Sequence, residues 1–330
     1  MRADLTRRRV ISILAASTAL PTLAGRAIAA PVPYRWQGIV LGAAADLTLY
    51  AEDRAAASEA VAAALAEIAR LEAIFSLHQT DSALSRLNRA GRLEVAPFEL
   101  RELLSQALQL ADMSDGRFEP TVQPLWKLYA DHFAQPDADL AGPSVAELAA
   151  VGRSIDYRGV RFAGDAIVFD RPGMQVTLNG VAQGYISDRI GTLLKERGLT
   201  HALVNLGETL AIDRRSDGHA WTIGVPAPDD RTRLVTEVEV SAGAIATSAG
   251  RGLMFDASGR FNHIIDPRSL ACADPDRSIT VLAPSAAIAD GLSTLGALLP
   301  DPQRDLPPFL ARFQARALVF SSRKDDLAWI

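Results

Sequence analysis

A carboxylate and a hydroxyl stand four residues apart near the C-terminal end of the chain. Asp290 and Thr294 lie in residues 285–299, which follow Pro284 and are predicted to form a helix. Residues four apart share one helix face, so both oxygens point in the same direction. Carboxylate and hydroxyl oxygens are hard ligands that suit Mg²⁺. The same spacing is also typical of an ordinary polar helix face, or of a threonine hydrogen-bonded to its own helix.

A single histidine occupies a junction between a strand and a turn. His263 lies in the run Phe-Asn-His-Ile-Ile-Asp-Pro-Arg, residues 261–268, where a strand-like stretch leads into an Asp-Pro turn. A histidine at the edge of a site is suited to general-base catalysis, because its pKa lies close to neutral pH. A lone histidine is also often structural, so the pattern leaves both interpretations open.

Residues 177–185, Thr-Leu-Asn-Gly-Val-Ala-Gln-Gly-Tyr, join a predicted strand to a predicted helix. Their two glycines allow a ligand to approach the backbone closely, and a helix N-terminus favours phosphate. The segment is neither the Gly-x-Gly-x-x-Gly pattern of dinucleotide-binding folds nor a P-loop. Alone, it indicates a nucleotide site only weakly.

The composition is that of an ordinary globular protein. The chain has 330 residues, of which 48% are hydrophobic and 22% charged, enough for a sizeable core. A net charge of −5 gives no electrostatic reason to expect a nucleic-acid partner. Cys272 is the only cysteine, which excludes an internal disulfide and a multi-cysteine metal site.

The first thirty residues have the order of regions found in export signals. Arg7 and Arg8 precede an apolar run over residues 10–24, and residues 27–29 supply a small-residue cleavage pattern. The apolar run is shorter than the roughly 20 residues of a bilayer-spanning helix. Because the arginine pair resembles a twin-arginine signal, we predict a signal peptide over residues 1–29 and export to the periplasm. The alternative is a basic N-terminal membrane anchor.

Helices and strands are distributed unevenly along the predicted mature chain. Apolar spacings predict helices over residues 54–75, 100–111, 181–197 and 285–299. Short runs bounded by Gly, Asp and Pro predict strands, including residues 37–50, 167–169, 176–178, 261–265, 317–320 and several more between 202 and 282. The lack of strict strand–helix alternation favours an α+β fold over a doubly wound parallel sheet.

Five stretches together resemble the ApbE family of FAD:protein FMN transferases, in the order and near the spacings of that family. The first two are the early helix-and-turn motif of residues 75–88 and Gly-Arg-Phe-Glu-Pro-Thr-Val at residues 116–122. The third is residues 179–188, and the fourth combines residues 203–207, residues 246–248 and the His263 turn. The last is Ala-Asp-Gly-Leu-Ser-Thr at residues 289–294. The resemblance spans about residues 38–298.

The resemblance implies an α+β fold of antiparallel sheets packed with helices, related to the T-fold, in one domain over residues 30–330. It implies that Mg²⁺ is held by Asp290, Thr294 and the backbone carbonyl of Gly180. It also implies that His263 activates a Ser or Thr hydroxyl of a recipient protein, which attacks the FMN-side phosphorus of FAD and releases AMP. The implied partners are FAD and a periplasm-facing redox protein that accepts the flavin. Further FAD contacts are implied at Leu41, His78, Arg117, Phe118, Glu119, Thr177, Gln183, Ile264 and Ser293.

Several positions depart from the family pattern. Gln183 replaces a charged residue, His78 replaces an aromatic one, and Glu208 and Leu270 stand where glycine is usual. Two other functions use the same site. One is a periplasmic FAD-binding protein without transfer activity, which the changes at Gln183 and Glu208 favour. The other is a Mg²⁺-dependent FAD pyrophosphatase, in which water takes the place of the acceptor hydroxyl.

Overall fold

An antiparallel sheet of eight strands forms the centre of the protein. The computed structural model describes residues 33–40 and 43–330, so the predicted signal peptide and the Leu41 contact lie outside the described residues. Every neighbouring pair of strands in the sheet is antiparallel. The strand order is β1 (Tyr34–Val40), β2 (Ala43–Leu49), β6 (Ala202–Asn205), β7 (Thr209–Ala211), β10 (Gly243–Ala249), β13 (Arg277–Ala283), β14 (Arg316–Ser321) and β15 (Asp326–Trp329).

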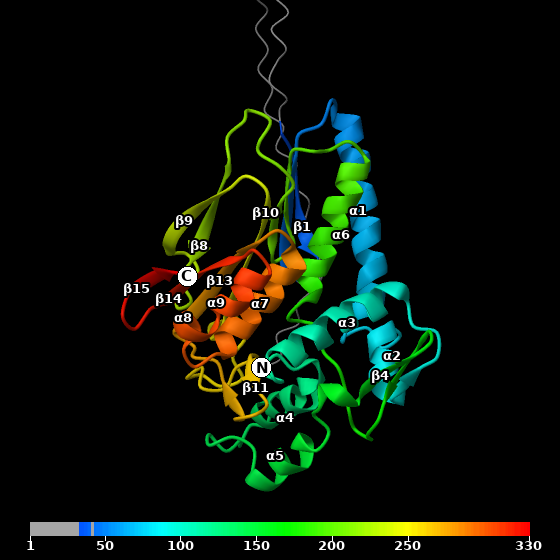
Figure 1. The fold of residues 1–330 in the computed structure, drawn as a ribbon, viewed down its shortest axis with the longest axis vertical. Coiled ribbons are helices and arrows are strands. Elements are labelled where there is room, and N and C mark those ends of the chain that lie inside the picture. The colour runs from blue at the N-terminus through cyan, green and yellow to red at the C-terminus, as the bar shows by residue number, and fades with distance from the viewer. Residues whose placement is uncertain (1–32, 41–42) are drawn as a thin grey trace, which may run out of the picture.

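Different elements cover the two faces of this sheet (Figure 1). Helices α1 (Arg54–Phe75), α6 (Ala182–Glu196) and α7 (Ala286–Leu298) pack on one face, and the hairpin of β8 (Trp221–Pro226) and β9 (Leu234–Val240) packs on the other. The alternation of side chains along each strand divides the core accordingly. On β13, for example, Ile279 and Val281 face the helices while Leu282 faces the hairpin.

Most of the remaining elements lie at one end of the sheet, with α4 and α5 lowest in Figure 1, whereas the two short helices within residues 302–312 lie beside α7. The helices are α2 (Ala83–Ala90), α3 (Phe98–Met113), α4 (Gln123–Phe133), α5 (Val145–Gly152), α8 (Pro302–Asp305) and α9 (Pro307–Arg312). The 3₁₀ turns are η1 (Pro120–Val122), η2 (Tyr157–Gly159) and η3 (Gly250–Gly252). Two small sheets complete the fold: β3 (Arg92–Leu93), β5 (Ala166–Phe169) and β4 (Val160–Ala163) form one, and β11 (Ile265–Asp266) and β12 (Ala271–Cys272) form the other. Within the described ranges, no helix is both long and apolar enough to cross a bilayer.

Helices α6 and α7 cross in close contact near their N-terminal ends. A Cβ atom at Gly184 would lie 2.2 Å from the carbonyl oxygen of Ala286, so only glycine permits this approach. One turn further along α6, Asp188 accepts hydrogen bonds from the Ser285 hydroxyl at 2.7 Å and from the Ala286 and Ala287 amides at 2.8 and 2.9 Å. A carboxylate of α6 therefore caps the positive end of α7.

The C-terminal end of α7 is also held by a charged side chain. Arg277 on β13 donates hydrogen bonds to the carbonyl oxygens of Ala297 at 3.1 Å, Leu299 at 2.7 Å and Pro300 at 3.2 Å. A cation at this end complements the helix dipole and satisfies carbonyls that have no partner within the helix. Helix α7 is thus fixed at both ends by opposite charges from its neighbours.

Most predicted elements are confirmed, and so is the α+β class. The predicted helices correspond to α1, α3, α6 and α7. The strand predicted at residues 176–178 is wrong: the Asn88 side chain donates to the Val176 carbonyl and accepts from the Val176 amide, so a side-chain amide replaces a neighbouring strand. The strand predicted at 261–265 is reduced to an isolated bridge between Met254 and Asn262, followed by β11.

We expect Gly184→Ala to destabilise the protein by ~1–3 kcal/mol, because the added methyl overlaps the Ala286 carbonyl and forces the two helices apart. Gly152→Ala is the matched control, since a Cβ there meets no atom within 4 Å. It should be neutral or stabilising by up to about 1 kcal/mol. Urea unfolding followed by circular dichroism measures both. Equal stability of Gly184→Ala and wild type would contradict the assigned helix contact.

Candidate active site

One of the two groups predicted to bind a metal, the Thr294 hydroxyl, meets β10. The Ser248 hydroxyl lies 2.8 Å from the Ser293 hydroxyl and 3.3 Å from that of Thr294. Ser293 also donates a hydrogen bond back to the Asp290 carbonyl of its own helix at 2.9 Å. The hydroxyl that bonds back to α7 therefore belongs to Ser293, while that of Thr294 is directed toward the sheet. Ser248 is a contact that periodicity along one helix does not reveal.

Gly180 lies directly against Thr294. A Cβ atom at Gly180 would lie 3.2 Å from the Thr294 hydroxyl oxygen and 3.2 Å from the Phe118 ring. The absence of a side chain thus leaves room beside the hydroxyl and brings the turn before α6 up to α7. Three residues predicted from separate motifs, Gly180, Thr294 and Phe118, meet at one place.

Asp290 is buried beneath this place, with only 4% of its surface exposed. One of its carboxylate oxygens accepts a hydrogen bond from the Gly184 amide at 3.1 Å. Burial raises the pKa of Asp290 to about 7; the Gly184 hydrogen bond opposes this rise and the nearby Asp188 carboxylate adds to it. The group is therefore poised to lose its proton when a cation binds.

A second buried carboxyl group adjoins Asp290. Glu208, at the start of β7, is 8% exposed, and its Oε2 atom has no hydrogen-bond partner among the described residues. Burial and the neighbouring Asp290 carboxylate raise the pKa of Glu208 well above its usual value. The sequence identified Glu208 only as a departure from a glycine pattern, because nothing in its local context indicates burial.

These residues fit a divalent cation that prefers oxygen. The predicted ligands are the Gly180 carbonyl, the Thr294 hydroxyl and the buried Asp290 carboxylate, which are all hard oxygen groups, and the missing side chain at Gly180 leaves room beside Thr294. In the described part of the chain, no group of three or more His, Cys, Asp or Glu side chains is placed to hold a metal. A cation here must therefore take hydroxyl, carbonyl and water oxygens in addition to carboxylates.

His263 is held in one orientation by the backbone. Its Nδ1 atom lies 3.0 Å from the Leu253 carbonyl oxygen, which also accepts the His263 amide at 3.1 Å. Nδ1 is thus the protonated nitrogen of the neutral ring, and Nε2 carries the lone pair. Burial lowers the pKa of His263 below its ordinary value of 6.5, against the effect of the hydrogen bond. A Cβ at Gly252 would lie 3.2 Å from Cε1, so this glycine leaves the ring edge uncovered.

An aromatic cluster supports the turn that carries His263. Phe261 packs against Tyr129 and Phe133 of α4, with ring centroids 5.4 and 4.9 Å apart. The Tyr129 hydroxyl donates to the Leu270 carbonyl at 3.1 Å. Leu270 has φ of +60°, a conformation that favours glycine, which accounts for the glycine expected at this position.

Arg117 and Glu119 make structural contacts next to the predicted flavin site. Arg117 forms an ion pair with Asp266 at 3.1 Å and so links its loop to the His263 turn. The Glu119 carboxylate accepts hydrogen bonds from the Thr121 amide and hydroxyl and from the Tyr157 amide, and burial raises its pKa. Glu119 is therefore a buried brace as well as a predicted contact.

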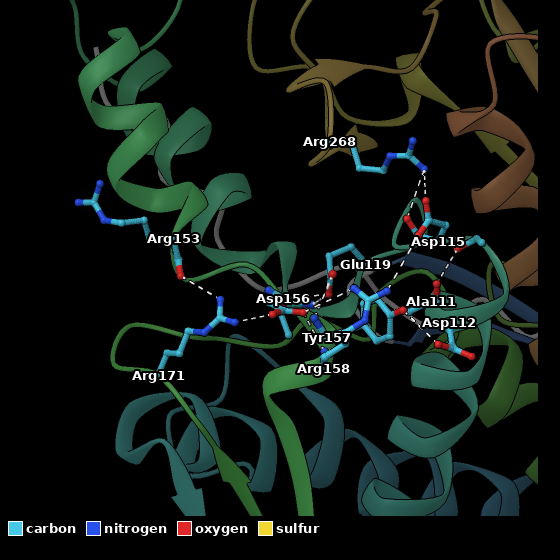
Figure 2. Close-up of polar contacts among 12 residues, drawn as sticks. Ala111, Asp112, Asp115, Glu119, Arg153, Asp156, Tyr157, Arg158, Arg171 and Arg268 are labelled. Atoms are coloured by element: carbon cyan, nitrogen blue, oxygen red, sulfur yellow. Dashed lines mark hydrogen bonds and ion pairs between the residues drawn. The ribbon is translucent and has the colours of Figure 1, made fainter.

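Figure 2 shows this brace within a row of charged side chains. Arg268 reaches the Asp115 carboxylate at 3.3 Å, and Arg158 lies 3.9 Å from Asp115 and 4.0 Å from Asp156. The network joins the loop before Phe118 to the turn after His263. Unlike the Asp290 contacts, most of these pairs are exposed to solvent.

The other predicted flavin contacts fall in two groups. Ile264 and Ser293 are buried, and the Gln183 amide lies against Gly207, where a Cβ would come within 2.9 Å of it. These residues adjoin the cation and histidine positions. His78 is exposed in the loop after α1, and Thr177 lies in the extended segment after Gln175.

An open groove of about 750 Å³ lies beside these last two regions. Its walls come from α2, α4 and the segment before Thr177, and they include Leu77, Asn88, Lys127 and Gln175. His78 and Thr177 lie one and two residues beyond two of these positions and do not line the groove themselves.

The sequence model of the ApbE family matches residues 41–307, and the chain belongs to this family. A Treponema pallidum protein named FAD:protein FMN transferase is 31% identical over 286 residues, which cover 78% of this chain and 76% of that protein. A Salmonella typhimurium protein of the same name is 28% identical over 235 residues; the match covers 67% of this chain and 65% of that relative's length.

Solved structures of this family have the same fold. The ApbE protein of Thermotoga maritima is 25% identical and superimposes with a TM-score of 0.78, covering 90% of this chain and 96% of that one. The flavin transferase ApbE of Vibrio cholerae is 23% identical with a TM-score of 0.75, covering 91% and 97%. The resemblance stated from five motifs is confirmed over most of the chain.

We expect an NMR titration of the histidine ring resonances to give His263 a pKa below 6.5, because burial disfavours the imidazolium form. Nitrogen chemical shifts should identify Nδ1 as the protonated atom of the neutral ring. His263→Gln assigns the signal by removing it. A pKa at or above 6.5, or a neutral ring protonated at Nε2, would show that the ring is held differently.

Proposed function

We propose that this chain is an FAD:protein FMN transferase that uses Mg²⁺ and modifies a Ser or Thr of a recipient redox protein. The observation that best supports this function is that one short segment, residues 248–252, contacts both a proposed cation ligand and the candidate base. Ser248 lies 3.3 Å from the Thr294 hydroxyl, and Gly252, four residues later, adjoins the His263 ring. This segment therefore connects the proposed cation position to the candidate base.

In this proposal His263 acts on the acceptor hydroxyl. Nε2 takes the proton as the hydroxyl oxygen bonds to the FMN-side phosphorus of FAD, the bridging P–O bond breaks, and AMP leaves. The Leu253 carbonyl, which accepts from Nδ1, holds the reactive tautomer and stabilises the imidazolium that forms. When bound, Mg²⁺ neutralises charge on the pyrophosphate oxygens. Asp290, Thr294 and the Gly180 carbonyl are the groups that would hold it.

The same protein mixed with FAD and Mg²⁺ separates this function from its two alternatives. We expect AMP to appear, and flavin to become covalently attached, only after a recipient protein is added. AMP without a recipient would instead identify an FAD pyrophosphatase. FAD retained intact in the presence of a recipient would identify a binding protein.

The dependence of AMP release on Mg²⁺ concentration distinguishes the roles of Asp290 and Thr294. Asp290→Asn removes the charge of a buried ligand, so we expect AMP release to be lost and to stay lost in excess Mg²⁺. Thr294→Ala removes a neutral ligand that water can replace, so we expect the half-saturating Mg²⁺ concentration to rise about tenfold with partial rescue. Full activity of Asp290→Asn, or of wild type in EDTA, would disprove the metal assignment.

We also propose that the protein acts in the periplasm on a recipient that faces this compartment, after twin-arginine export and cleavage near Ala29. The support is the order of regions over residues 1–29. Replacing Arg7 and Arg8 with lysine should keep the full-length chain in the cytoplasm, as detected by fractionation and immunoblotting. Mature protein in the periplasm of the double variant would refute this route.

A further inference from the structure

Glu208 is a buried acid whose carboxylate is only partly hydrogen-bonded: the Thr247 amide is one partner, and the Oε2 atom has none among the described residues. It is 92% buried, since 8% of its surface is exposed. The preceding Gly207 has φ of +111° and lies against the Gln183 side chain at the start of α6. The Glu208 side chain is buried after this turn, next to Thr247 on β10, and the Asp290 carboxylate is close enough to raise its pKa.

Two neighbouring carboxyl groups in the protein interior require compensation. Transferring either charge from water is costly, and their mutual repulsion adds to that cost. Among the described residues, no arginine or lysine forms a salt bridge with Glu208 or Asp290, and the Asp290 carboxylate accepts a hydrogen bond from the Gly184 amide. A buried acid that served only packing would be better replaced by an apolar side chain, or by the glycine expected here.

A bound divalent cation would compensate the negative charges of these two carboxylates. Glu208 and Asp290 are neighbouring buried carboxylates, and Thr294, one turn beyond Asp290 on α7, lies against Gly180. We propose that Glu208 is a second charged ligand of this pocket, so that a divalent cation is held between two carboxylates. This inference rests on the cation site of the proposed function and assigns it a further residue.

The expected consequence is tighter cation binding before any nucleotide is present. Affinity for hard divalent cations rises with the number of charged oxygen ligands. A site with Asp290 alone would depend on phosphate oxygens of the substrate, whereas a site with two carboxylates retains the cation without them. Binding to the substrate-free protein is therefore the informative measurement.

Mn²⁺ serves as the probe, with free Mn²⁺ counted by electron paramagnetic resonance in the absence of FAD and recipient. We expect Glu208→Gln and Glu208→Gly to weaken Mn²⁺ binding at least about tenfold. Glu239→Gln, on the exposed side of β9, is the matched control and should bind as wild type does. Unchanged Mn²⁺ affinity of Glu208→Gln would overturn the proposal.

Thermal unfolding and the Asp290→Asn variant test whether a change in Mn²⁺ binding is due to Glu208 itself. Without cations, Glu208→Gln should be at least as stable as wild type, because a buried charge is removed, and it should gain less stability from added Mn²⁺. If Asp290→Asn loses Mn²⁺ binding while Glu208→Gln retains it, only the role of Glu208 is wrong. If Asp290→Asn also binds normally, the cation site of the proposed function is wrong as well.

Discussion

The contact between α6 and α7 is the constraint from which the candidate site follows. Glycine at position 184 lets the two helices approach until backbone meets backbone, and the Asp188 carboxylate then caps α7. At the same crossing, the Gly184 amide reaches the Asp290 carboxylate. The same contact therefore joins the helices and orients Asp290, the proposed metal ligand. Because backbone atoms define it, Asp290 is positioned more rigidly than a side chain on a loop would be.

The proposed cation ligands and His263 are held in place by different kinds of interaction. The proposed cation ligands lie among buried polar groups, where low solvent exposure raises the pKa of Asp290 and Glu208 and makes a cation their natural complement. His263 lies on a turn that aromatic rings support from behind, and burial there keeps the ring neutral. The cation ligands thus favour binding a positive ion, and His263 favours accepting a proton.

Local patterns in the sequence predicted those parts of the site that depend on one element. The period of residues 285–299 placed Asp290 and Thr294 on a common face, and the Asp-Pro turn placed His263 at a junction. The same reasoning could not predict contacts between elements. Ser248 on β10 meets Thr294 on α7, and the Asn88 side-chain amide takes the place of a neighbouring strand at Val176. Glu208 appeared only as a departure from a family pattern, because its burial depends on how the turn before β7 packs against β10 and α6.

The charged network beside Asp115 has a consequence for how the protein responds to its surroundings. Arg158 and Arg268 approach Asp115 at 3.9 and 3.3 Å on the surface, between the loop before Phe118 and the turn after His263. At the ionic strength of a physiological buffer the screening length is about 8 Å, and it shortens as salt is added. Salt therefore reaches the links that align these two loops, but not the buried contacts of Asp290. Added salt should therefore weaken the exposed part of the link to the His263 turn, while the partly buried Arg117–Asp266 pair and the contacts of Asp290 are screened much less.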